Sequence, residues 1–242
     1  MTTSQRLYEA ARPIWEACLS HPFVTGIGDG TLSVEKFQYF MLQDYLYLFD
    51  YAKVFALGVV KAQDRKLMQT FSQNVYSILN GEMNIHRAYM RRLGITEEQV
   101  SAVKPALDNV SYTHYMLAVA AMGGPAEIVA SILACSWSYA EIGQALARIP
   151  GAAEHPFYGE WIQGYASDDY AAGNQALIEL TDTLSQGMTE AEIARLEDIF
   201  VNCSRYELGF WDMAWEMRKG ASWNLSTSPT STPPRISTSS TI

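Results

Sequence analysis

Apolar residues in this chain recur at intervals of three and four along long stretches that few turn signals interrupt. This spacing places them on one face of an α-helix, whereas a half-buried strand alternates every second residue. No convincing alternating segment occurs anywhere in the sequence. The pattern therefore predicts an all-α fold, a single-domain helical bundle over residues 1–220.

Capping signals give the expected helix boundaries. Ser33 has the side chain of an N-cap, Thr96 and Thr189 open T-x-x-Q and T-x-x-E capping boxes, Asn109 is a further candidate cap, and Pro125 suits a first helical position. A loop, GIGDGTL, is expected after His21-Pro22-Phe23. The expected helices cover about residues 5–19, 34–62, 65–93, a short helix after 96, 109–122, 125–148, 156–166, 169–184 and 190–218.

The last part of the chain has a different composition. From Ser222 onward it consists almost entirely of Ser, Thr and Pro, without apolar periodicity. Such a segment cannot bury enough apolar surface to offset its conformational entropy. Residues 221–242 are therefore expected to be a disordered tail, native or added, outside the folded domain.

Charge and cysteine content exclude several classes of protein. The formal net charge of −9 and the absence of any long basic cluster disfavour nucleic acid and anionic membranes as partners. The three cysteines are widely spaced, which suggests neither a disulfide framework nor a zinc site. No apolar run approaches the length of a membrane span, and the N-terminus lacks the apolar core of a signal peptide. We expect a cytoplasmic protein without a metal or cofactor.

One helix face combines a carboxylate with two phenols. Asp44, Tyr47 and Tyr51 fall at i, i+3 and i+7, and Phe40 and Phe55 flank them, so this face is expected to point inward. A buried carboxylate needs partners, because an unpaired buried charge costs several kcal/mol. The residues alone leave two interpretations: Asp44 fixes packing, or it binds a ligand.

Two further helices carry reactive groups among apolar neighbours. Cys135 and Tyr139 lie at i and i+4, and Glu207 lies four residues before Trp211. A free cysteine usually behaves as a small buried hydrophobe, which is the expectation for Cys18 and Cys203. Tyr112, near a helix start, and Tyr165, near a helix end, give weaker signals. Glu82 and His86 are spaced as a structural Glu–His hydrogen bond, and His86 and His114 have no supporting signal as haem ligands.

Six blocks, in order, carry a resemblance to a known family. They are HPFVTGIGDGTL, FQYFMLQDYLYL, SYTHYM, PAEIVASILACSWSYAEIG, HPFYGEWIQGYAS and YELGFWDMAW. Together they resemble the TenA/thiaminase II family over about residues 5–220. The resemblance implies a haem-oxygenase-like helical fold without haem, a cytoplasmic homotetramer, and salvage of the pyrimidine half of thiamin. The implied reaction hydrolyses 4-amino-5-aminomethyl-2-methylpyrimidine to hydroxymethylpyrimidine and ammonia, with thiamin hydrolysis as a related activity.

The resemblance also implies roles for individual residues. Cys135 would be the nucleophile, Glu207 the proton donor to a ring nitrogen, and Tyr47 the phenol near the sulfur. The remaining residues would bind substrate: Asp44 through the 4-amino group and adjacent ring nitrogen, Tyr139 by stacking or hydrogen bonding, and Tyr112 and Tyr165 by lining the pocket and ordering water. The cysteine places the chain in the cysteine-bearing branch of the family.

Two alternatives remain open at this point. One is a metal or haem oxidase on the same fold, which would need a stoichiometric metal. The other is a non-catalytic protein that binds pyrimidine or thiamin. A binding protein predicts that Cys135→Ser keeps affinity and has no turnover to lose, whereas an enzyme predicts loss of turnover.

Overall fold

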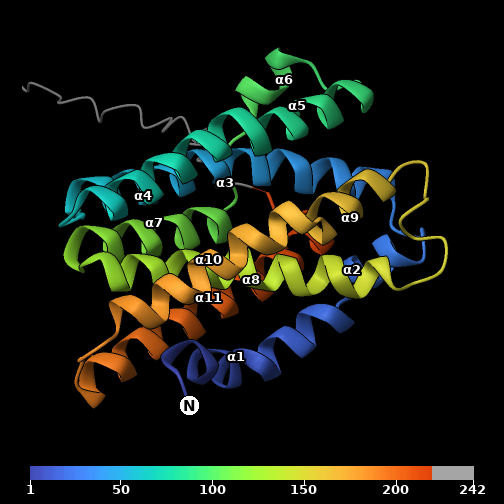
Figure 1. Ribbon diagram of the computed structural model, residues 1–242. Helices are drawn as coiled ribbons and strands as arrows, with labels where there is room; N and C mark the ends of the chain where they lie inside the picture. Colours follow the sequence, from blue (N-terminus) through green and yellow to red (C-terminus); the bar gives the residue numbers. More distant parts are fainter. Residues whose placement is uncertain (220–242) are drawn as a thin grey trace, which may run out of the picture.

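The computed structural model describes residues 1–219, and every regular element in that range is a helix (Figure 1). This confirms the all-α class. The helices are α1 (Thr3–Ser20), α2 (Pro22–Gly28), α3 (Val34–Lys61), α4 (Arg65–Ser77), the π-helix η1 (Ile78–Glu82), α5 (Met83–Arg92), α6 (Glu97–Ala102), α7 (Leu107–Met122), α8 (Pro125–Ala147), α9 (Gly159–Ala166), α10 (Asp168–Leu184) and α11 (Glu190–Glu216).

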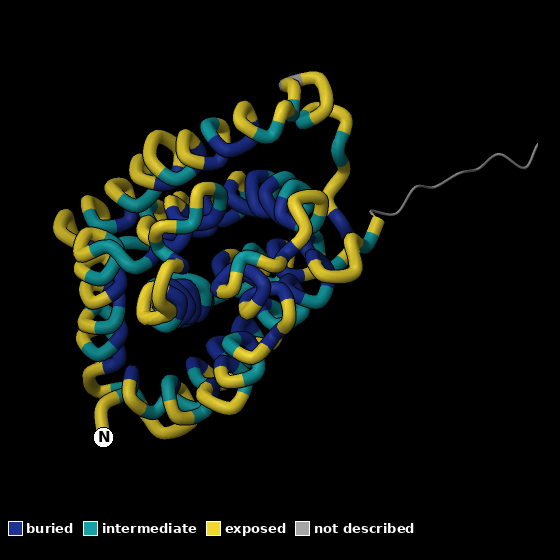
Figure 2. Tube along the Cα trace, turned by 90° about the vertical axis from the view of Figure 1, so that its right-hand side faces the viewer, coloured by how far each residue is buried: buried dark blue, intermediate teal, exposed yellow. Residues whose placement is uncertain are grey.

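Helix α8 lies at the centre of the bundle. It packs against α11, α9, α10, α7 and α3, while α1 covers α11 and α4 and α5 cover α3 (Figure 1). Buried residues follow the inward faces of the helices, and exposed residues follow the outer faces (Figure 2). The inner faces of α3, α8 and α11 therefore meet in the interior, and these faces carry most of the reactive side chains singled out in the sequence.

The predicted capping boxes are confirmed. The Thr96 hydroxyl accepts a hydrogen bond from the backbone N–H of Gln99 at 3.2 Å, and the Gln99 side chain accepts one from the backbone N–H of Thr96 at 2.8 Å. Thr189 and Glu192 form the same reciprocal pair at the start of α11. These bonds satisfy N–H groups that a helix start leaves without an intrahelical partner.

Three expectations about helix starts are wrong, and each has a local cause. Asn109 is not a cap, because α7 already begins at Leu107 and the Asn109 amide donates to the Gln43 carbonyl at 2.7 Å. The expected loop after His21 begins as α2, in which the His21 ring caps the first turn and Phe23, Val24 and Ile27 are buried. Helix α9 begins at Gly159 rather than Pro156, after turns that His155 Nδ1 supports by accepting from two backbone N–H groups.

The helix expected over residues 65–93 is interrupted in its middle. Residues Ile78–Glu82 form the π-helix η1 between α4 and α5. A π-turn inserts one additional residue per turn, so it rotates the side chains that follow relative to a regular α-helix. The side chain of Glu82, the last residue of η1, therefore points in another direction than its i, i+4 spacing with His86 suggested.

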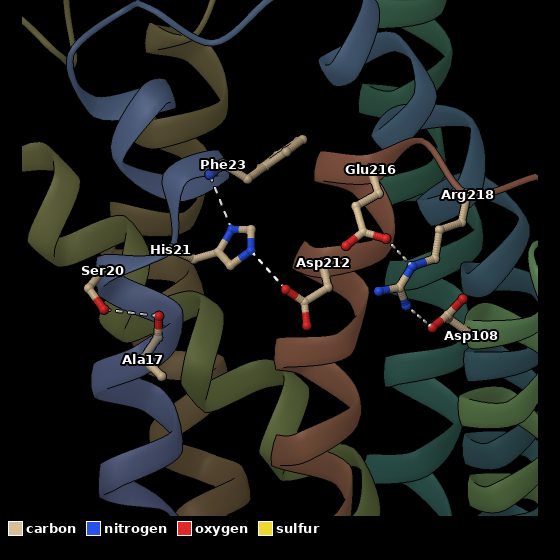
Figure 3. A network of polar contacts seen from close by, with 8 residues as sticks. All are labelled: Ala17, Ser20, His21, Phe23, Asp108, Asp212, Glu216 and Arg218. Carbon is tan, nitrogen blue, oxygen red and sulfur yellow. Dashed lines mark hydrogen bonds and ion pairs between the residues drawn. The ribbon is translucent and has the colours of Figure 1, made fainter.

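The C-terminal half of α11 is held by polar contacts to other helices (Figure 3). His21 Nδ1 accepts from the Phe23 backbone N–H at 3.1 Å, so Nε2 carries the proton and donates to Asp212 of α11 at 3.2 Å. Just beyond α11, Arg218 donates to Asp108 of α7 at 2.6 Å. These contacts fix the helix that carries Glu207.

Within residues 1–219, no helix is long and apolar enough to cross a membrane. The expected disorder of residues 221–242 concerns a segment that lies outside the described residues.

Candidate active site

A small cavity lies in the interior of the bundle, with about 20 Å³ open to a water-sized molecule. It is lined by nine residues from five helical segments: Asp44, Tyr47, Leu48, Tyr51, Glu82, Cys135, Tyr139, Tyr165 and Tyr170. The wall thus combines one thiol and two carboxyl groups with five phenols. Such a wall can bind a flat polar ring by stacking and hydrogen bonding together.

The structure brings all seven candidate site residues to this region. Five of them line the cavity: Asp44, Tyr47, Cys135, Tyr139 and Tyr165. The other two form a buried pair beside it, in which the Tyr112 hydroxyl donates to Glu207 Oε1 at 2.6 Å. The negative charge of Glu207 raises the pKa of the Cys135 thiol, so the Tyr112–Glu207 pair lies close to the sulfur.

The three cysteines lie in different environments. Cys18 and Cys203 are buried in the hydrophobic core, as the sequence predicted for them. Cys135 keeps partial exposure and lines the cavity. Its sulfur is therefore accessible to a small molecule in the cavity, which a purely structural core cysteine would not be.

The thiol of Cys135 is protonated in the resting protein. Removal from water raises its pKa well above the usual value, and the negative charge of Glu207 raises it further. A hydrogen bond from Tyr47 acts in the opposite direction, since it stabilises the thiolate. The sulfur must therefore lose its proton to a nearby base when it reacts.

Glu207 is suited to accept and return that proton. Its side chain is only 2 % exposed. Desolvation raises its pKa to about 7, while hydrogen bonds from Tyr112 and Cys135 partly oppose the shift. A carboxyl group whose pKa lies near neutrality can move a proton in both directions at physiological pH.

Asp44 has a buried partner that the sequence analysis missed. His86 Nδ1 lies 2.9 Å from the Glu82 backbone carbonyl, which can only accept, so Nδ1 carries a proton. His86 Nε2 lies 2.6 Å from Asp44 Oδ2. Burial lowers the pKa of His86, but the hydrogen bond and charge of Asp44 outweigh it and the net shift is upward. His86 therefore pairs with Asp44 through Oδ2 and leaves Oδ1 for a ligand.

The expected Glu82–His86 side-chain hydrogen bond is wrong. His86 contacts the backbone carbonyl of Glu82, and the Glu82 carboxyl group instead accepts from the Tyr165 hydroxyl at 3.1 Å. The physical reason is the π-helix, which directs the Glu82 side chain into the cavity wall beside α9.

Sequence reasoning also missed Tyr170 as a cavity residue. It lies in the first turn of α10, and nothing in its sequence context marks it. Glu82 did carry a signal, since a glutamate four residues before a histidine was visible, but the pair was interpreted as structural. Among residues 1–219, no group of three or more His, Cys, Asp or Glu side chains is arranged to hold a metal ion.

Gly143 of α8 allows the close approach of α9, which carries Tyr165. A Cβ atom at position 143 would lie 2.7 Å from the Tyr165 carbonyl carbon and 2.9 Å from the Ala166 nitrogen. Gly143→Ala is expected to lower the free energy of unfolding by about 1–3 kcal/mol, because backbone atoms must shift. Chemical denaturation measures this change.

Gly173→Ala is the matched control, since a Cβ atom there meets nothing within 4 Å inside α10. It is expected to stabilise the protein by up to about 1 kcal/mol through helix propensity. Equal effects of the two substitutions would contradict the packing argument.

Comparison with known proteins supports a shared ancestry along most of the chain. The model of the TENA/THI-4/PQQC family matches residues 8–217. An aminopyrimidine aminohydrolase of Halalkalibacterium halodurans is 51% identical over 224 residues, which cover 93% of this chain and 99% of that protein.

Solved structures agree with the fold. The structure of a TenA homologue from P. horikoshii OT3 superposes with a TM-score of 0.82 at 30% identity and covers 89% of this chain and 99% of that one. A Shewanella denitrificans domain described as having a heme oxygenase-like fold superposes with a TM-score of 0.71 at 17% identity, over 88% of this chain and 92% of that one. This likeness confirms the expected haem-oxygenase-like fold.

Proposed function

Because the chain belongs to the TENA/THI-4/PQQC family, we propose that it is an aminopyrimidine aminohydrolase (thiaminase II) of thiamin salvage. It hydrolyses 4-amino-5-aminomethyl-2-methylpyrimidine to hydroxymethylpyrimidine and ammonia, and thiamin to hydroxymethylpyrimidine and the thiazole. The observation that carries the proposal is an accessible thiol, Cys135, that shares an enclosed cavity with Asp44 and adjoins Glu207. The name of the half-identical relative supports the same reaction.

In this proposal Cys135 and Glu207 act as a proton-coupled pair. The resting thiol is neutral, so ionised Glu207 takes its proton as the sulfur bonds to C6 of the pyrimidine. Glu207 then passes the proton to ring N1, which prevents negative charge from accumulating on the ring. Tyr47 stabilises the sulfur through its hydrogen bond, and Tyr112 orients Glu207.

Asp44 recognises the opposite edge of the ring. With Oδ2 held by His86, its Oδ1 can accept a hydrogen bond from the 4-amino group. The five phenols of the cavity wall supply stacking surfaces and donors, and Tyr139 lies 4.9 Å from Tyr165 and 5.4 Å from Trp211 between ring centroids. The aromatic wall thus holds the ring so that C6 faces Cys135.

Release of ammonia from the aminomethyl substrate by the purified protein tests the proposal. Hydroxymethylpyrimidine should appear in equal amount, measured by chromatography of the same samples. An oxidase instead predicts a stoichiometric metal and an absorption band in the visible, and a binding protein predicts affinity for the pyrimidine with no product. Absence of ammonia at substrate concentrations that saturate binding would reject the hydrolase.

The assembly and location of the protein are also proposals. The family resemblance supports a homotetramer in the cytoplasm, with a small aminopyrimidine or thiamin as the only ligand. Light scattering on the protein as it elutes from a size-exclusion column gives the mass of the assembly directly.

A further inference from the structure

The proposed reaction needs a second proton, at the amine that leaves. A C–N bond to a neutral amine breaks readily only if the nitrogen gains a proton as the bond breaks, because an amide anion is too basic to leave. The proton that Glu207 handles is used at ring N1. The following inference rests on the proposed function and identifies the group that serves the leaving amine.

The order of groups around the ring indicates where that second proton donor must lie. In the proposed complex, N1 of the pyrimidine faces Glu207, C6 faces Cys135, and the 4-amino group faces Asp44. The carbon that carries the aminomethyl group, C5, lies between C6 and C4. A donor to the leaving amine must therefore lie on the cavity wall near both Cys135 and Asp44.

Glu82 satisfies this condition. It lines the same cavity as Cys135 and Asp44. Its negative charge raises the pKa of the Cys135 thiol, and the charge of Asp44 raises the pKa of Glu82. Desolvation raises the pKa of Glu82, with the positive charge of His86 opposing the shift. The Tyr165 hydroxyl donates to Glu82 Oε1 at 3.1 Å and fixes the orientation of the carboxyl group.

The backbone also presents Glu82 to the cavity in a particular way. Glu82 is the last residue of η1, and its carbonyl accepts from His86, the residue that holds Asp44. The two carboxyl groups of the wall are therefore joined through His86. A π-turn at this point, as often found at functional sites, directs Glu82 toward the cavity.

We propose that Glu82 is a catalytic residue that protonates the leaving amine and then takes a proton from the water that replaces it. After Cys135 has added to C6, the C–N bond breaks, its electron pair stays on nitrogen, and protonated Glu82 supplies the proton that makes ammonia. The 4-amino nitrogen supplies the electron pair that forms an exocyclic methylene at C5, which leaves a cationic ring.

The remaining steps return every group to its starting state. Water adds to the methylene carbon, and its proton goes to the Glu82 carboxylate, which gives the hydroxymethyl group and neutralises the ring. The C6–S bond of Cys135 then breaks as N1 returns its proton through Glu207 to the sulfur. The net change is one water consumed and one ammonia released.

Thiamin has the same pyrimidine ring, but its leaving group needs no proton. Its leaving nitrogen is quaternary, so the thiazole leaves as a neutral molecule without a proton. Glu82→Gln is therefore expected to lower kcat for the aminomethyl substrate by about a hundredfold, the usual contribution of a general acid. The loss for thiamin should be at least tenfold smaller, and a trimethylammonium analogue of the substrate gives the same comparison with a smaller leaving group.

The controls separate catalysis from folding. Glutamine has the shape of glutamate and can still accept from Tyr165, so the melting temperature of Glu82→Gln should stay close to that of the wild type. Glu160→Gln, at an exposed ion pair of α9 with Arg92, should leave both rates unchanged.

Each outcome decides the inference. A larger loss for the amine than for thiamin supports the role of Glu82. Equal losses for both substrates, or no loss, overturn this role and leave the hydrolase intact. A wild-type protein that releases no ammonia overturns the hydrolase, and the role of Glu82 with it.

Discussion

Cys135→Ser is expected to lower the rate of ammonia release by about a thousandfold or more, because loss of a covalent nucleophile is among the largest effects of a single residue. A serine hydroxyl in the same position is far less acidic than a thiol, so it forms the attacking anion much less readily. In the proposed binding mode, Asp44 and the aromatic wall hold the pyrimidine without the sulfur. Affinity for hydroxymethylpyrimidine, measured by calorimetry, should therefore change only slightly.

Cys18→Ala is the matched control for this experiment. Cys18 is buried in α1 and does not line the cavity, so its removal should leave turnover per folded molecule unchanged. Rates for Cys135→Ser equal to those of the wild type would rule out covalent catalysis through this thiol. Loss of binding together with loss of turnover would show that the sulfur also positions the ring.

Glu207→Gln is expected to lower kcat/KM by about a hundredfold to ten-thousandfold and to change its dependence on pH. The pKa of Glu207 is raised to about 7, and the pKa of the Cys135 thiol lies higher still. The active form holds one proton between them, which is the neutral thiol beside an ionised Glu207. The wild-type rate should therefore rise with pH through about 7.

The glutamine variant should lack this rise, since it lacks the Glu207 carboxyl group whose pKa is about 7. Ionisation of the substrate itself affects both proteins equally and cancels in the ratio of their rates. A ratio that stays constant between pH 5 and pH 9 would contradict the role of Glu207.

The same shift makes a prediction about stability. An unfolded Glu207 has its ordinary pKa of 4.5, whereas the folded value is about 7. Between these pH values the unfolded chain releases the proton and the folded chain keeps it, so rising pH lowers the free energy of unfolding by about 1.4 kcal/mol per pH unit. Glu207→Gln lacks this loss, so its stability relative to the wild type should increase from pH 5 to pH 8 in urea denaturation.

Much of the fold was predictable because the relevant interactions are local. The capping boxes at Thr96 and Thr189 use groups three residues apart, and the face of Asp44, Tyr47 and Tyr51 depends only on helical periodicity. The start of α2 was missed because its cap is a histidine ring, His21, rather than the usual Ser, Thr, Asp or Asn side chain.

The sequence by itself determined which residue types lie on which helix faces, since the α-helix repeat fixes these faces within a few residues. The resemblance to a family added roles for seven of them. Local spacing does not predict which helices meet, because Asp44 and His86 lie 42 positions apart and Tyr112 and Glu207 lie 95 apart.

Only the tertiary structure decided the state of the reactive groups. Burial and the charge of Glu207 keep the Cys135 thiol protonated, and packing leaves Cys135 at the cavity wall while it buries Cys18 and Cys203 in the core. The π-turn places Glu82 in the wall, and His86, from the helix that follows it, is the partner of Asp44. These properties depend on desolvation and on the distances between charges from separate helices, and a linear sequence contains neither.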